Sequence, residues 1–184
     1  MLNILYTQNL RGNLALLPRL YTFMRSLKDE GRAIVLDLGG SCDDAVWHCQ
    51  ATAGRSTLIA LDGMGYHGAN INGALDTVIA QKLAEQVALR LCDGDTLKYV
   101  DADSGLEIML KADKKTALNG NILTLQAVNA GQIGQVIVQR DSLAVHRAKV
   151  HTVPESALPD PTIAGVIDFI IGEARFYQKR REER

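Results

Sequence analysis

A strand, a helix and a second strand follow one another within residues 1–37, and this order constrains the fold most. Residues 2–7 and 33–37 are apolar runs of strand length without alternation, as in strands covered on both faces. Between them, apolar side chains keep the spacing of one helical face: Leu17, Leu20, Tyr21, Met24 and Leu27. Gly31 is expected to end this helix. The unit predicts two parallel strands joined by a crossover helix.

The rest of the first half continues the alternation of strands and helices. We expect a short helix over residues 45–52, a third strand over 57–61 and a loop rich in Gly and Asn over 62–73. Helical spacing resumes over residues 75–83. Residues 87–91 alternate; they fit either an extension of that helix or a strand, and we favour the strand. This half is predicted to be α/β with parallel strands.

From residue 96 onward the pattern becomes largely antiparallel β. Asp103, Ser104 and Gly105 separate two strand-like runs and indicate a hairpin. Further strands are expected over residues 122–128, 133–140 and 143–150. The second half is therefore predicted to add antiparallel strands to the parallel units.

A helix is expected to close the domain. Asp160 and Pro161 form an N-cap and a first helical residue. Residues 1–178 are predicted to be one domain, followed by a charged tail, 179–184, that frays. The helix provides a homodimer surface if Phe169 and Phe176 are exposed.

Charge and cysteine content limit the partners and the compartment. The chain has 20 Lys+Arg against 21 Asp+Glu, so it lacks the basic excess typical of nucleic-acid or membrane-surface binding. The N-terminal run resembles a strand more than a signal peptide, and no apolar run is long enough to span a bilayer. Three cysteines, an odd number, favour free thiols. We expect a cytoplasmic protein that binds neither nucleic acid nor membrane.

Three segments resemble a known family in order and spacing. Residues 4–12 correspond to the family's HTNDLHG, residues 35–41 to LDAGDS, and residues 60–66 to NAMGYDA. The chain thus resembles the N-terminal domain of 5'-nucleotidases and 2',3'-cyclic-nucleotide phosphodiesterases, within the calcineurin-like metallophosphoesterase superfamily. The resemblance implies a shortened α/β/β/α sandwich, with parallel βα units in the first half and antiparallel strands in the second.

The same resemblance implies a two-metal centre, and this chain departs from it. Family members bind two metal ions that position and activate a hydroxide for attack on phosphorus. A ligand Asp falls on Asn9, a ligand His on Arg11 and the bridging Asp on Gly40, while Asn72 matches a ligand Asn. We therefore expect no cofactor and a non-catalytic domain, a pseudoenzyme. The alternative is a phosphoesterase or 5'-nucleotidase-type hydrolase with an atypical metal site.

The departures also suggest a different use for the site. Five residues are candidates for binding a small anion or nucleotide, or for contacting a protein partner: Asn9, Arg11, Asp37, Ser41 and Asn72. The competing interpretation is structural. In it, Arg11 fills the vacated metal pocket and pairs with Asp37.

One group of soft side chains is a second candidate. Cys42, His48 and Cys49 suggest zinc or a reactive thiol. Their spacing matches no compact zinc motif, however, and free cysteines often act as small buried apolar residues. We favour buried cysteines and expect no metal here.

Overall fold

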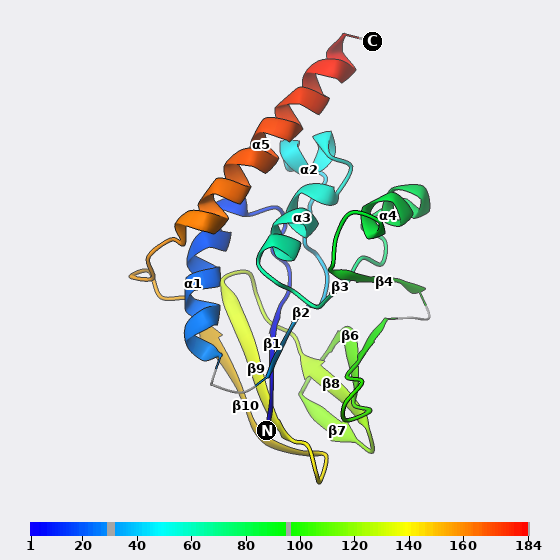
Figure 1. The fold of residues 1–184 in the computed structure, drawn as a ribbon, viewed down its shortest axis with the longest axis vertical. Helices are drawn as coiled ribbons and strands as arrows, with labels where there is room; N and C mark the ends of the chain where they lie inside the picture. Colours follow the sequence, from blue (N-terminus) through cyan, green and yellow to red (C-terminus); the bar gives the residue numbers. More distant parts are fainter. Residues whose placement is uncertain (29–31, 95–96, 184) are drawn as a thin grey trace.

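The chain folds into two mixed β-sheets, and helices cover the outer face of the larger one (Figure 1). The computed structural model describes residues 1–28, 32–94 and 97–183. The larger sheet has six strands: β10 (Ala144–Thr152), β9 (Gln132–Gln139), β1 (Leu2–Thr7), β2 (Ala33–Asp37), β3 (Gly68–Asn70) and β4 (Arg90–Cys92). The smaller has four: β5 (Lys98–Val100), β6 (Glu107–Asp113), β8 (Ile122–Gln126) and β7 (Ala117–Asn119).

The helices fill the intervals between the strands of the first half and close the chain. Within the described residues they are a 3-10 turn, η1 (Leu14–Leu16), and the α-helices α1 (Leu17–Leu27), α2 (Trp47–Ala51), α3 (Arg55–Gly63), α4 (Thr77–Ala84) and α5 (Pro161–Glu182). The expected strand, helix and strand of residues 1–37 are confirmed, and β1 pairs with β2 in parallel. Gly31, predicted to end the first helix, lies outside the described residues.

β1 is buried on both faces, as its unalternating apolar sequence predicts. Leu2, Ile4 and Tyr6 face the core between the two sheets. Leu5 faces the core under the helices. Successive side chains of a strand point to opposite faces, so this strand carries apolar residues on both, and its buried Asn3 donates a hydrogen bond to Leu27 O at 2.8 Å. Burial of β1 on both faces thus fixes the position of the turn that follows Thr7.

The second half adds antiparallel strands to both sheets, as predicted. β9 pairs antiparallel with β1, and β10 with β9. β5 and β6 form the expected hairpin, with Lys98 opposite Met109. The short strand β7 was not predicted. The fold is therefore a mixed α/β fold with two mixed sheets.

One expected strand is wrong. Residues 57–61 are predicted to be a strand, but they lie within α3. Short apolar runs do not distinguish a buried helix from a buried strand. Gly54, in the left-handed conformation with φ 82°, starts the helix just before that run. The parallel strand that follows is instead β3, inside the predicted loop 62–73.

α5 begins where the sequence predicts and extends further than expected. The Asp160 carboxylate accepts hydrogen bonds from the backbone N–H groups of Thr162 and Ile163, at 3.0 and 3.1 Å. The helix continues to Glu182, through most of the segment expected to fray. Phe169 and Phe176 are 64% and 58% exposed, so the condition set for a dimer surface is met and the dimer stays a prediction.

The described helices gather on one side of the molecule. Residues of α1, α3, α4 and α5 contribute to the core on the outer face of the six-stranded sheet. The sandwich implied by the resemblance has a second helical layer, and the described residues form no helix over the small sheet (Figure 1). Among the described residues, no helix combines the length and apolarity needed to cross a membrane.

Candidate functional site

Two turns cross at the carboxyl edge of the parallel strands β1 and β2. Asn9 N–H donates to Gly39 O at 2.9 Å, Arg11 N–H to Gly40 O at 2.8 Å, and Gly12 N–H to Ser41 O at 2.7 Å. We call these two segments, residues 9–12 and 39–41, the turn crossing. Open α/β sheets bind ligands at this edge. Three of the five candidate residues, Asn9, Arg11 and Ser41, thus come together here.

The turn crossing holds non-glycine residues in the left-handed conformation. Asn9 has φ 56° and Arg11 φ 49°. Such backbone conformations are uncommon for residues other than Gly, Asn and Asp, and they cluster at functional sites. The backbone hydrogen bond from Arg11 N–H to Gly40 O holds this turn in place, and Arg11 is exposed.

The Asn9 side chain closes the space beside Gly40. A Cβ atom added at Gly40 would lie 2.7 Å from Asn9 Oδ1. That distance is well below ordinary van der Waals contact. Position 40 is where the resemblance has a bridging Asp, and a glycine there supplies no metal ligand.

Asp37 is buried in a network of hydroxyl groups. Its Oδ2 accepts hydrogen bonds from Ser41 Oγ at 2.9 Å and from Gly39 N–H at 3.1 Å, and its Oδ1 accepts from Thr7 Oγ1 at 3.3 Å. The Tyr66 hydroxyl donates to Thr7 Oγ1 at 3.0 Å. Burial raises the pKa of Asp37 to about 6, although these hydrogen bonds oppose the shift.

The structure corrects the predicted ion pair between Arg11 and Asp37. Asp37 is fully buried and hydrogen-bonded to other groups, whereas Arg11 is exposed. Within the described residues, Arg11 forms no ion pair. The hydroxyl network satisfies the carboxyl, so no guanidinium has to be buried beside it.

Asn70, rather than Asn72, reaches the turn after β2. Its Nδ2 donates to Leu38 O at 3.2 Å and to Leu110 O at 2.9 Å. Asn72 is exposed, and its backbone N–H donates to Asn70 Oδ1 at 2.8 Å. Asn70 is not among the residues predicted from the sequence, because residues 62–73 are predicted to be a loop. A correct assignment of β3 would have placed Asn70 at the carboxyl end of a parallel strand, and that position would have made it a candidate.

The three soft side chains cluster around the Ser56 hydroxyl. Cys42 Sγ lies 3.4 Å from Ser56 Oγ, and Cys49 Sγ lies 3.7 Å from it. Both ring nitrogens of His48 are engaged, Nδ1 by Ser56 Oγ and Nε2 by Gly12 O, each at 2.9 Å. This arrangement leaves His48 no lone pair directed at a metal ion.

Cys42 and Cys49 differ sharply in acidity. Hydrogen bonding from Cys49, Ser56 and Thr57 lowers the pKa of Cys42 to about 6, although burial opposes the shift. The hydrogen bond to Cys42 and burial raise the pKa of Cys49. Cys49 is fully buried and Cys42 is half-buried, so Cys42 is the thiol available for reaction.

The residues of the turn crossing do not fit a two-metal centre. Asn9 is neutral, Gly40 has no side chain and Arg11 carries a fixed positive charge beside the turn. Two dications need several anionic or imidazole ligands. In the part of the chain that the structure describes, no three His, Cys, Asp or Glu side chains form a group that could hold a metal ion.

A calcineurin-like phosphoesterase and a 5'-nucleotidase precursor are two solved structures with a similar arrangement, so the chain has the calcineurin-like phosphoesterase fold. The calcineurin-like phosphoesterase YfkN from Bacillus subtilis aligns over 96% of this chain and 98% of its own, with a TM-score of 0.61 and 8% identity. The 5'-nucleotidase precursor from Thermus thermophilus aligns over 95% of this chain, with a TM-score of 0.60 and 9% identity. The alignment spans 59% of that nucleotidase.

No family model and no curated protein sequence matches the chain. The fold shared with the two solved structures supports the resemblance to the phosphoesterase superfamily that three sequence segments first suggested.

Proposed function

We propose that this chain is a non-catalytic domain with the phosphoesterase fold, and that it binds a small anion, such as the phosphate of a nucleotide, at the turn crossing. The observation that carries the proposal is the exposed Arg11 guanidinium, which stands where the resemblance has a metal-ligand His. A guanidinium binds phosphate through charge-assisted hydrogen bonds and needs no metal.

The neighbourhood of Arg11 supports an anion over a metal ion. Asn9, two residues before Arg11 in the same turn, is neutral, and its Oδ1 lies next to Gly40. Asp37 is removed from this exposed surface by its own hydroxyl network. The left-handed conformation of Arg11 is the kind of backbone strain that functional sites retain. The three free thiols support a reducing, cytoplasmic setting.

Calorimetry with inorganic phosphate, AMP and cyclic AMP tests the binding. We expect binding of at least one of these ligands by the unmodified chain, and about tenfold weaker binding by Arg11→Gln, because the charged hydrogen-bond donor is lost. Arg175→Gln is the matched control, since it removes the same charge from an exposed position on α5. The absence of both heat and thermal stabilisation with all three ligands would contradict the binding proposal.

A hydrolysis assay tests whether the domain is non-catalytic. We expect no turnover of p-nitrophenyl phosphate or nucleoside monophosphates with added Mn²⁺. Turnover that depends on Mn²⁺ and disappears in Asn72→Ala or Asn70→Ala would instead establish the alternative, a phosphoesterase with an atypical metal site. Each outcome therefore selects one of the two functions.

A further inference from the structure

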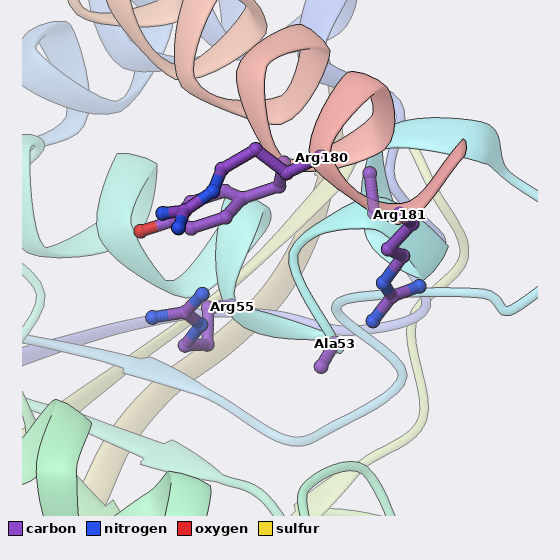
Figure 2. A pocket seen from close by; sticks show the side chains of 6 residues that line it. Ala53, Arg55, Arg180 and Arg181 are labelled. Atoms are coloured by element: carbon purple, nitrogen blue, oxygen red, sulfur yellow. The ribbon is translucent and has the colours of Figure 1, made fainter. Parts of the chain in front are cut away.

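Three arginines from two helices line a cavity between α5 and the loop that joins α2 to α3 (Figure 2). Arg55 is the first residue of α3, and Arg180 and Arg181 lie in the last turn of α5. The cavity has a volume of about 250 Å³, and Ala51, Ala53 and Tyr177 complete its lining. We call it the arginine pocket.

Protein contacts orient two of the arginines but use few of their donors. Arg55 Nε donates to Thr52 O at 2.8 Å, and its guanidinium lies 5.3 Å above the Tyr177 ring. Arg181 Nη1 donates to Gln50 O at 3.1 Å. A guanidinium has five N–H donors, so these bonds hold the side chains in place and leave most donors available.

The positive charge of the pocket is not neutralised by the described part of the chain. Among those residues, none of the three arginines forms an ion pair. The nearby acids have other contacts: Glu183 lies 3.9 Å from Lys179, and Glu182 accepts a hydrogen bond from Gln178 at 3.3 Å. The whole chain has a net charge of −1, so the accumulation of arginines is local.

Helix dipoles account for the positions of Arg180 and Arg181 but not for that of Arg55. Arginines in the last turn of α5 are explained by the negative carbonyl end of that helix. Arg55 lies instead at the N-terminus of α3, where the helix dipole is positive and repels a cation. The first turn of α3 has no acidic residue, and its N-cap, Gly54, makes no side-chain cap. Thr52 Oγ1 accepts a hydrogen bond from the Ser56 N–H at 3.1 Å, so a bound anion would mainly offset the charge of the Arg55 guanidinium.

Two adjoining cavities extend the same surface. One shares Ala53 and Arg55 with the arginine pocket and adds Lys82. The other shares Ala51 and Arg181 and adds Trp47, which is 41% exposed, together with Glu182. Lys82 thus adds a fourth cationic side chain to the three arginines, which favours a ligand with several negative charges.

We propose that the arginine pocket binds a small ligand carrying two or more phosphate groups, at a site separate from the turn crossing. Arg55, Arg180 and Arg181 bind the phosphate oxygens, and the Tyr177 ring holds the Arg55 guanidinium in position. This inference does not depend on the proposed function, because no residue of the turn crossing lines the pocket.

Calorimetry and thermal stabilisation with tripolyphosphate at constant ionic strength test the site. We expect binding by the unmodified chain and about tenfold weaker binding by Arg180→Gln, because one charge-assisted hydrogen-bond donor is lost. Arg180 is exposed and contacts the Phe176 ring, so this variant is expected to fold. Arg55→Lys keeps the charge but loses the planar fork, and it is expected to weaken binding as well.

Two controls separate the possible outcomes. Arg175→Gln removes one charge from α5 outside the pocket, and Arg11→Gln removes the charge at the turn crossing. Arg175→Gln is expected to bind tripolyphosphate like the unmodified chain. Arg11→Gln loses only the binding at the turn crossing and is expected to keep the binding that Arg180→Gln weakens. No binding by either measurement, or an equal loss in Arg175→Gln, would overturn the proposal. Loss in Arg11→Gln alone would also overturn it and would assign the ligand to the turn crossing.

Discussion

Asp37 lies where the sequence pattern predicts, but its hydrogen-bond partners differ from the charged partner that was predicted. Its place at the end of a buried strand was evident from the sequence, and a charged partner was expected for it. The structure provides three hydrogen-bond donors instead, from Thr7, Gly39 and Ser41. Gly39 and Ser41 belong to the turn that follows Asp37, whereas Thr7 ends β1, so its approach to Asp37 depends on the parallel pairing of β1 with β2.

The raised pKa of Asp37 predicts a specific dependence of stability on pH. Its pKa is about 6 in the folded chain, against an ordinary value of 3.8. Between these values the folded state holds a proton that the unfolded state has released, so the contribution of Asp37 to stability falls as pH rises. The loss is about 3 kcal/mol, complete just above pH 6. Asp37→Asn should remove this loss of stability with rising pH, because the amide does not titrate.

Urea unfolding from pH 4 to pH 7.5 measures this effect as the difference in the free energy of unfolding between Asp37→Asn and the unmodified chain. Other titrating groups cancel in the difference. We expect the variant to gain relative stability as pH rises to about 6 and to change little above it. A difference that stays constant from pH 4 to pH 7.5 would show that Asp37 does not titrate in this range.

The lowered pKa of Cys42 predicts selective alkylation. Hydrogen bonding lowers the pKa of Cys42, so its thiolate is more populated at neutral pH than that of an ordinary cysteine. We expect iodoacetamide to label Cys42 before Cys49 and Cys92, with a rate that reaches half its maximum well below the ordinary thiol pKa of about 8.5. Peptide mass spectrometry measures each site. The midpoint should move upward in Thr57→Val, and a midpoint near 8.5 in the unmodified chain would contradict the prediction.

At the scale of elements, the sequence predicts helices and strands best where long patterns or caps define them. α5 begins at its predicted cap because Asp160 and Pro161 act locally. The run at residues 57–61 is too short for its periodicity to decide between helix and strand, and the predicted strand is wrong. β3 has only three residues, and it exists because β2 and β4 pair with its two edges.

Two glycines that look alike in sequence should respond oppositely to alanine. Gly134 of β9 lies opposite Tyr6 of β1, and a Cβ there would overlap the Tyr6 ring. We expect Gly134→Ala to lower the free energy of unfolding by about 3 kcal/mol. Gly172 lies inside α5 with no heavy atom near a Cβ position. Gly172→Ala should raise the free energy of unfolding by about 0.5–1 kcal/mol, because Ala favours a helix more than Gly does. Denaturant unfolding measures both, and equal effects would refute this explanation.

At the scale of the whole molecule, α5 presents an apolar surface that the fold leaves uncovered. Phe169 and Phe176 lie seven residues apart, about two helical turns, and therefore on one face. We expect a second copy of the chain to cover them. Sedimentation velocity should then show about twice the 20.0 kDa mass of one chain. Phe169→Ser combined with Phe176→Ser should return the mass to that of a single chain, and a monomer before substitution would contradict the prediction.

The sequence by itself determined the fold class, the central β1–α1–β2 unit and the fact that Asn9, Arg11 and Gly40 stand where the resemblance has metal ligands. These properties depend on local periodicity, on caps and on which side chains are present at a few positions. Only the tertiary structure decided that Asp37 pairs with hydroxyl groups while Arg11 is exposed, and that Asn9 fills the space at Gly40. It also brought Arg55 to the end of α5. These residues are far apart in the chain, and only packing of the sheet and helices sets the distances between them.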